Sequence, residues 1–262
     1  MVQLQRIAIA PEQIQDEHLI LTAEQQHYLG RVLRLKQGDR FIIIAAQGQW
    51  WIVELMVNLP SASPQGKLIE RVLIQTELSV EIILIVALPK GDGFEEIVRC
   101  CTELGVTQFI PVMSQRTVLK PSVQKVERWR RIATEAAEQS ERQIVPTIFD
   151  PVSFKQGLLL SIKPMNQGAS SNFKLKKKYQ YICEGRGNYQ HFMVELISVT
   201  SKQIPDKIII ATGPEGGWTE AEIQEAIAIG FQPISLGKRI LRAVTAPIVA
   251  VSQLVGMIEK ME

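Results

Sequence analysis

The segment that most constrains the fold of this chain is Val80–Leu88, which is almost entirely apolar and rich in β-branched residues. A strand without a polar face must be covered on both sides, and this favours a central place in a parallel sheet between layers of helices. Later runs of similar character predict further strands at Thr107–Val112, Tyr179–Cys183, Lys207–Ala211 and Pro233–Ser235. Because helical patterns separate these runs, we expect an α/β fold.

Helices are predicted where apolar residues recur with the helical period. Phe94–Leu104 places its apolar residues on one face, and longer helices are predicted at Val123–Glu141 and at Arg242–Glu259. Residues 163–178 are polar and basic, which predicts a mobile surface loop.

The N-terminal part of the chain has a different pattern, with short strands and few helices. Phe41–Ala46 and Trp50–Val57 are apolar runs separated by a Gln-Gly-Gln turn, and they predict a hairpin. A further strand is predicted at Lys67–Gln75, and a helix from Thr22 to about Leu33 with Thr22 as its N-cap. This pattern predicts a small β-barrel-like module.

The change of pattern predicts two domains, over residues 1–76 and 77–262. The composition then excludes several classes of protein. The three cysteines form no CxxC pair, so we expect neither a zinc site nor a disulfide framework. The longest apolar run, Ile82–Leu88, is far shorter than the ~18 residues of a membrane span, and the start of the chain has no secretion signal. We expect a soluble cytoplasmic protein.

The sharpest motif is Thr212–Trp218, with the sequence TGPEGGW, which follows a predicted strand directly. Thr219 and Glu222 fit a capping box, so a helix is expected to start after it. Glycine allows backbone to approach a ligand, and ligands bind at the carboxyl ends of strands in open α/β sheets. The motif is neither GxGxxG nor a P-loop, which disfavours nicotinamide and nucleoside triphosphate ligands. The alternative is a tight strand-to-helix turn without a ligand.

A second glycine-containing motif, LGKRIL at Leu236–Leu241, follows the last predicted strand and is continued by Arg242. Two basic clusters also stand out, one within residues 27–40 and one within residues 115–131. Such clusters suit phosphate contacts, although a run of charge is also typical of a solvated face. The net charge of +2 does not by itself call for a nucleic-acid partner.

The order and spacing of several blocks resemble the bacterial ribosomal small-subunit RNA methyltransferase E family. These blocks are HYLGRVLRLKQGD (His27–Asp39), LPKGDGFEEIV (Leu88–Val98), TELGVTQFIPVMSQRTV (Thr102–Val118), EAAEQSERQIVP (Glu135–Pro146), TGPEGGWTEAEI and LGKRILR. The resemblance implies a PUA-like β-barrel followed by a SPOUT domain with a trefoil knot. It also implies a homodimer that binds no metal ion. The implied reaction is methylation of N3 of one uridine in small-subunit ribosomal RNA, with S-adenosylmethionine as the methyl donor and the assembled subunit as the expected substrate.

The resemblance also implies a set of site residues. The cofactor is expected to lie against Cys183, Glu184, Thr212, Gly213, Pro214, Glu215, Gly216, Gly217, Leu236, Gly237, Arg239, Ile240 and Leu241. Arg242 and Arg116 are candidates to stabilise charge on the uracil oxygens, and Glu215 is a candidate base or a residue that shapes its loop. RNA is expected to contact His27, Arg31, Arg34, Lys36 and Arg142.

Three positions depart from the family pattern. Cys100 stands where the family commonly has Lys, and Ala243-Val244 stand where it commonly has Thr-Glu. Two other readings stay open: a SPOUT enzyme that shares the cofactor loops but methylates a ribose 2′-OH, and an RNA-binding factor that has lost catalysis, which the Ala243-Val244 departure alone supports.

Overall fold

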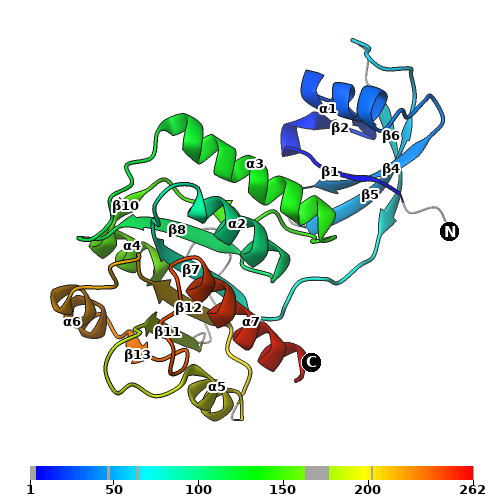
Figure 1. Cartoon of the computed structure of the whole chain (residues 1–262). Coiled ribbons are helices and arrows are strands. Elements are labelled where there is room, and N and C mark those ends of the chain that lie inside the picture. The colour runs from blue at the N-terminus through cyan, green and yellow to red at the C-terminus, as the bar shows by residue number, and fades with distance from the viewer. Residues whose placement is uncertain (1–3, 46–47, 63–64, 163–176, 202, 262) are drawn as a thin grey trace. The chain divides into compact units, whose positions relative to one another are not determined.

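The computed structural model describes residues 4–45, 48–62, 65–162, 177–201 and 203–261. The chain forms two compact units, each with its own sheet (Figure 1). The first unit comprises Met1–Glu77 and Ala137–Val145, and the second comprises Leu78–Ala136 and Pro146–Glu262. Most of the loop predicted at 163–178 lies outside the described residues.

The second unit is built on a seven-stranded sheet in which every described pair of neighbouring strands is parallel. Its strand order is β10 (Val152–Ser153), β8 (Gln108–Met113), β7 (Glu81–Ala87), β12 (Lys207–Thr212), β11 (Lys178–Cys183) and β13 (Gln232–Ile234). The short strand β9 (Thr147–Ile148) also pairs with β8. The four strands predicted after Val80–Leu88 all form, with ends that shift by a residue or two.

Strand β7 is covered on both faces, as its sequence predicts. Ile82, Leu84 and Val86 belong to one core cluster, whereas Ile83 and Ile85 belong to another. The first cluster lies under α2 (Gly93–Glu103), α3 (Val123–Gln139), α5 (Phe192–Thr200) and α7 (Thr245–Glu259). The second lies under α4 (Phe154–Ile162) and α6 (Glu220–Ala228). Each fully buried side chain of this strand contributes roughly 1.5–3 kcal/mol through apolar burial.

The first unit contains a six-stranded curled sheet. Its order is β1 (Arg6–Ala8), β4 (Arg40–Ala45), β5 (Gln49–Leu55), β6 (Gly66–Val72), β3 (His18–Leu19) and β2 (Ile14–Gln15). The β4–β5 and β5–β6 pairs are antiparallel, which confirms the predicted hairpin and the strand after it. Within the described ranges no ladder joins β1 to β2, so the expected barrel is a curled sheet there.

Two predicted helices are corrected by the structure. The helix expected from Thr22 to Leu33 is α1 (Ala23–His27) followed by a π-helical turn, η2 (Tyr28–Val32), although Thr22 does cap it through Gln25. The last helix begins at Thr245 rather than at Arg242. Because proline fits only the first turn of a helix, Pro247 limits how early this helix can start.

The segment Ala137–Val145 packs with the first unit, although it follows the sequence of the second. Its anchor is Arg142, which is 3% exposed and pairs with Glu77. Glu77 also accepts hydrogen bonds from the backbone N–H groups of Gln143 and Ile144. Because a buried charge must be paired, this carboxylate joins two parts of the chain that are remote in sequence.

Candidate functional site

The site lies in the second unit, at the carboxyl ends of three adjacent parallel strands. Strands β12, β11 and β13 each end in a loop, and the three loops line a cavity of about 120 Å³. The lining residues are Arg116, Cys183, Glu184, Gly185, Arg186, Gly213, Pro214, Glu215, Gly216, Gly217, Trp218, Leu236, Gly237, Arg239, Ile240, Leu241, Ala243 and Ala246. Open parallel sheets bind ligands at this edge.

The loop after β12 is a tight turn that runs into α6. The N–H of Gly217 donates to the carbonyl of Pro214 at 2.8 Å, and Gly217 has a φ of 69°, which suits glycine. Thr219 and Glu222 form the predicted capping box, with hydrogen bonds of 2.8 and 3.3 Å. The helix start is therefore fixed, and it holds the glycine-rich turn at the edge of the cavity.

Trp218 joins the loop after β12 to the loop after β11. Its indole N–H donates to the carbonyl of Cys183 at 3.2 Å, and its ring packs on Phe154 with centroids 4.6 Å apart. A Cβ at Gly213 would lie 3.3 Å from this indole, so the glycine lets backbone and ring approach closely. Trp218 therefore sets the spacing of two walls of the cavity.

The loop after β13 forms the third wall. Gly237 has a φ of 126°, and its backbone exchanges hydrogen bonds of 3.2 Å with the hydroxyl of Ser235. Ile240 is 68% exposed, and a Cβ at Gly185 would approach its side chain to 3.1 Å. An apolar side chain exposed at the rim of a cavity is typical of a ligand contact.

Arg116 connects β8 to the glycine-rich turn. Its Nη1 donates to the carbonyls of Gly216 at 2.6 Å and Trp218 at 3.1 Å. The guanidinium thus supports the turn while its side chain lines the cavity. Arg242 is exposed and does not line the cavity, although Leu241 and Ala243 on either side of it do.

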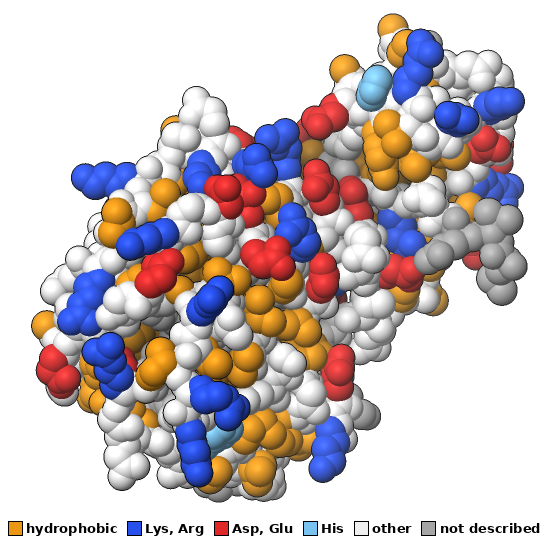
Figure 2. Space-filling model, in the orientation of Figure 1, with side chains coloured by type: hydrophobic (Ala, Val, Ile, Leu, Met, Phe, Trp, Pro, Cys, Tyr) orange, Lys and Arg blue, Asp and Glu red, His pale blue; other side chains and the backbone are white. Residues whose placement is uncertain are grey.

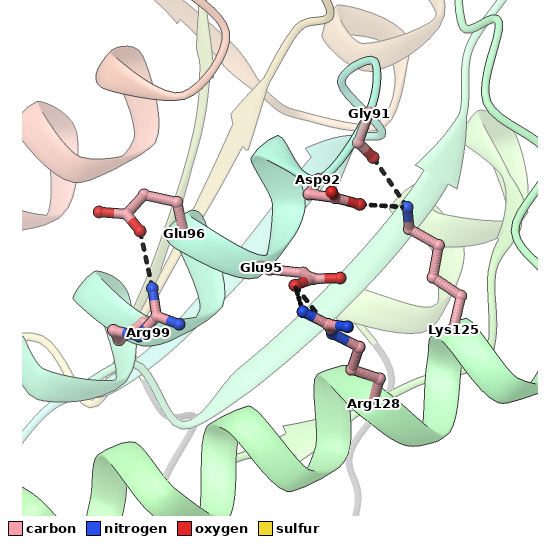
Figure 3. A network of polar contacts seen from close by, with 7 residues as sticks. All are labelled: Gly91, Asp92, Glu95, Glu96, Arg99, Lys125 and Arg128. Atoms are coloured by element: carbon pink, nitrogen blue, oxygen red, sulfur yellow. Dashed lines mark hydrogen bonds and ion pairs between the residues drawn. The ribbon is translucent and has the colours of Figure 1, made fainter.

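Glu215 contacts the segment between β7 and α2. Its Oε1 accepts a hydrogen bond of 2.9 Å from the backbone N–H of Lys90. The same segment is held from α3, because the Lys125 ammonium donates to the Gly91 carbonyl at 2.9 Å and to Asp92 at 2.8 Å (Figure 3). The hydrogen bond and charge of Lys125 hold the pKa of the Asp92 carboxyl below its usual range. The segment 89–93 is therefore fixed from two sides.

None of the three thiols is placed for nucleophilic chemistry. Burial raises the pKa of Cys101 and of Cys183 well above the usual value. Burial and a hydrogen bond to Glu96 also raise the pKa of Cys100. A thiol is reactive as its thiolate, so these groups stay protonated and weakly reactive near neutral pH.

The structure gathers nearly all the residues predicted for the cofactor around one cavity. Thr212 is the exception, since it is fully buried and its hydroxyl donates to the carbonyl of Ile85 at 3.5 Å. Sequence reasoning missed Gly185, Arg186, Trp218, Ala243 and Ala246. Of these, Gly185 and Arg186 directly follow the predicted strand that ends at Cys183, and Trp218 is the last residue of the TGPEGGW motif, so these three had a usable signal.

The residues predicted to contact RNA lie in the first unit, in two different settings. His27, Arg31, Arg34 and Lys36 are exposed. Arg142 is buried and paired with Glu77, so its guanidinium faces the interior of this unit rather than a partner.

The second basic cluster, at residues 115–131, is largely paired within the protein. Lys125 binds Asp92, Arg128 binds Glu95 (both in Figure 3), and Arg130 binds Glu127 and Asp150. These ion pairs compete with any phosphate contact. The cluster is therefore a weaker candidate for RNA than its sequence suggests.

Val244 has a packing role in this chain. It occupies the residue before α7 with α-helical backbone angles, makes no capping hydrogen bond, and packs against the core. A side-chain N-cap needs an extended backbone, so this position is not a regular cap. A Cβ at Gly93 would lie 2.8 Å from its methyl group, so Val244 and the start of α2 are closely packed.

Known families match both parts of the chain. An RNA methyltransferase domain matches residues 76–255, and an RNA methyltransferase PUA domain matches residues 21–55. With the loop-lined cavity at the sheet edge, these matches define the protein as an RNA methyltransferase with a PUA domain. The chain belongs to the ribosomal RNA small subunit methyltransferase E family. It is 46% identical over 254 residues to the protein of that name from a Synechocystis species. The aligned region covers 97% of this chain and 78% of that relative.

Other members confirm the assignment. The Bacillus subtilis ribosomal RNA small subunit methyltransferase E is 32% identical, over 94% of this chain and 93% of its own. The crystal structure of the Neisseria gonorrhoeae enzyme of the same name, bound to S-adenosyl methionine, is similar with a TM-score of 0.75 and 26% identity. That similarity covers 95% of this chain and 96% of the Neisseria chain.

No helix in the described ranges is long and apolar enough to cross a membrane. In the same ranges, no group of three or more His, Cys, Asp or Glu side chains is placed to hold a metal ion.

Proposed function

We propose that this protein binds S-adenosylmethionine in the cavity of the second unit and methylates N3 of a uridine in small-subunit ribosomal RNA. The observation that carries the proposal is the convergence of three loops at the carboxyl ends of β11, β12 and β13. Backbone groups of the glycine-rich turn and apolar side chains such as Leu236 and Ile240 suit an adenosine and a methionine chain. When bound, the cofactor supplies a methyl group activated by a sulfonium centre.

The cavity suits a ligand of this kind because it combines close backbone approach with charged edges. Gly213 and Gly185 stand where a Cβ would contact Trp218 or Ile240, so larger residues would narrow the space. Glu184 lines one side, where its carboxylate can face a cationic group. The adenine and ribose would meet backbone N–H and C=O groups of the loops, which provide specificity without extra charge.

The residues of this chain have to position the uracil and favour its deprotonated form. Uracil N3 loses its proton only in alkaline solution, so the site must stabilise negative charge on the neighbouring carbonyl oxygens. Arg242 is exposed beside the cavity and is our candidate for this role, with the free side of Arg116 as a second donor. Glu215 is engaged by the Lys90 N–H, and we assign it to positioning rather than to proton transfer.

We further infer that the second unit is a SPOUT domain with a trefoil knot and that it acts as a homodimer. Supporting the knot, the segment after the edge strand β13 contributes Leu236, Ile240 and Ala246 to the same cavity as the loops after β11 and β12. Supporting the dimer, helix α5 exposes Val194 and Ile197, which are 50% and 55% accessible. Residues 1–76 are assigned to RNA binding and residues 77–262 to methyl transfer. The substrate is the assembled small subunit in the cytoplasm.

Calorimetric titration with S-adenosylmethionine tests the cofactor site. Gly237→Ala forces a side chain onto a backbone with φ of 126°, and it should weaken binding roughly tenfold or more. Gly38→Ala is the matched control, because Gly38 has a φ of 88°, has open space around it and lies in the first unit. Equal affinities for both variants and the parent protein would place the cofactor elsewhere.

The product nucleoside separates the proposal from its alternatives. A uracil-N3 enzyme yields 3-methyluridine, whereas a ribose-directed SPOUT enzyme yields a 2′-O-methylnucleoside. An RNA-binding factor without catalysis is favoured only by the Ala243-Val244 departure, and it would bind RNA without transferring a methyl group. Because Val244 packs against the core rather than projecting a polar group, we do not assign it a chemical role.

A further inference from the structure

The π-helical turn η2 (Tyr28–Val32) and the residues after it form a fixed surface on the first unit. Leu29 is fully buried, and Leu33 and Leu35 pack against the same core cluster. A Cβ at Gly30 would lie 3.0 Å from the side chain of Leu59, so the backbone of η2 packs closely against Leu59. The side chains between these anchors are therefore held facing outward by the anchors themselves.

The outward side of this surface is apolar at its centre. Tyr28 is 38% exposed and Val32 is 58% exposed, and they are one helical turn apart. Figure 2 shows hydrophobic side chains beside Lys, Arg and His side chains on the first unit. An aromatic ring interleaved with basic residues is the arrangement that proteins use for unpaired nucleic-acid bases.

Exposed basic side chains lie close in sequence to this apolar centre. His27, Arg31, Arg34 and Lys36 are all exposed, and none of them forms an ion pair with another described residue. Among the acids of this region, Asp39 accepts the Lys36 backbone N–H, Glu54 pairs with Arg40, and Glu24 is exposed on α1. Within residues 27–40, Arg31, Arg34, Lys36 and Arg40 outnumber the single acid Asp39, and an excess of positive charge favours a polyanion such as RNA.

The backbone supports a functional reading of Arg34. Its φ is 58°, a left-handed conformation that costs a non-glycine residue about 1–2 kcal/mol. The N–H of Leu35 donates to the carbonyl of Leu29 at 2.9 Å, which makes Arg34 the helix-terminating residue where glycine is usual. A strained arginine in place of glycine, next to a π-helical turn, points to a binding role for its side chain.

We propose that Tyr28 and Val32 form a stacking surface for one unpaired RNA base, while Arg31, Arg34 and Lys36 hold the phosphates on either side of it. This inference rests on the proposed function, because it names the form of RNA that the first unit takes. Bases in a duplex are already stacked on one another and cannot reach the ring. The surface therefore selects single-stranded RNA.

Binding of a labelled single-stranded RNA, of a length within the ~4–16 nucleotides covered by such surfaces, tests the proposal. Tyr28→Ala should raise the Kd for this RNA by roughly 5- to 150-fold, the usual loss for one stacked base. Tyr28→Phe keeps the ring and should bind within about twofold of the parent protein. Ile69→Ala is the matched control, because Ile69 is 43% exposed on strand β6 of the same unit.

Two further measurements separate stacking from charge. The same sequence as a duplex should bind the parent protein and Tyr28→Ala equally well. The dependence of Kd on salt should be unchanged in Tyr28→Ala, but Arg34→Ala should reduce its slope by about 0.7. The proposal is overturned if Tyr28→Ala binds single-stranded RNA as tightly as the parent protein does, or if it loses the same affinity for duplex and for single strand. The apolar centre would then be a surface for binding another protein. Failure of the parent protein to bind any RNA would instead reject the proposed function.

Discussion

The Oε1 atom of Glu215 accepts a hydrogen bond of 2.9 Å from the backbone N–H of Lys90. This contact joins the glycine-rich turn after β12 to the segment between β7 and α2, which Lys125 holds from the other side. The carboxylate thus acts as a hydrogen-bond acceptor, although its position beside the cavity would also suit a base that removes the proton from uracil N3. The difference between these two roles can be measured.

Glu215→Gln retains an oxygen that can accept the Lys90 N–H, so its methylation rate should stay within about threefold of the parent enzyme. Glu215→Ala loses the acceptor and should be about fivefold or more slower, since an unmade hydrogen bond costs about 1 kcal/mol or more. Rates measured against pH give the decisive comparison. If Glu215→Gln is much slower and its residual rate no longer falls as the pH is lowered, Glu215 is the base.

Arg142→Met should destabilise the first unit by about 3–5 kcal/mol, because it leaves the carboxylate of Glu77 buried without its partner. Hydrogen exchange of the backbone amides of β4 and β5, measured against urea concentration, reports this change within the first unit. Arg71→Met is the control, since Arg71 is exposed on β6. Equal destabilisation by the two variants would show that the Arg142–Glu77 ion pair contributes no more to stability than an exposed arginine does.

Arg34→Gly should raise the free energy of unfolding by up to about 1 kcal/mol, because glycine adopts the left-handed conformation without strain. The same variant should bind single-stranded RNA more weakly. Arg34→Ala separates the two effects, since it removes the charge but keeps the strained backbone. A loss of stability in Arg34→Gly would mean that the guanidinium supports the fold rather than a ligand.

Stability should fall in alkaline solution because of the buried thiols. The pKa of Cys183 is raised by burial above its ordinary value of 9.0, so the folded state keeps the proton longer than the unfolded chain does. The resulting stabilisation is fully present below pH 9.0 and is lost as the pH rises above it. Denaturation midpoints between pH 7 and pH 10 should show this loss, and Cys183→Ala should reduce it. An unchanged slope in the variant would assign the alkaline loss to other groups.

Much of the fold could be predicted because the strongest signals are local. The two-sided burial of β7 follows from its apolar sequence, and the start of α6 follows from the spacing of Thr219 and Glu222. The glycine-rich loop is indicated by its place after a strand, whereas the full set of three loops follows from the family resemblance. Trp218 lies in the glycine-rich motif, but its place in the cavity wall depends on a hydrogen bond to Cys183 that spans 35 residues, and no local pattern predicts that contact.

Arg142 shows the opposite failure. In the sequence it is a polar residue in a charged block, and nothing nearby reveals that it is buried. Its partner Glu77 is 65 residues away, and the segment that carries it returns to the first unit. Likewise, the π-helical turn at Tyr28–Val32 depends on packing against Leu59 and could not be read from helical periodicity.

The most direct test of the central claim is methyl transfer from labelled S-adenosylmethionine to small ribosomal subunits that lack the modification, followed by digestion to nucleosides. We predict label in 3-methyluridine with the parent protein, and a strongly reduced yield with Gly237→Ala but not with Gly38→Ala. Label in a 2′-O-methylnucleoside, or no label despite bound cofactor, would contradict the account.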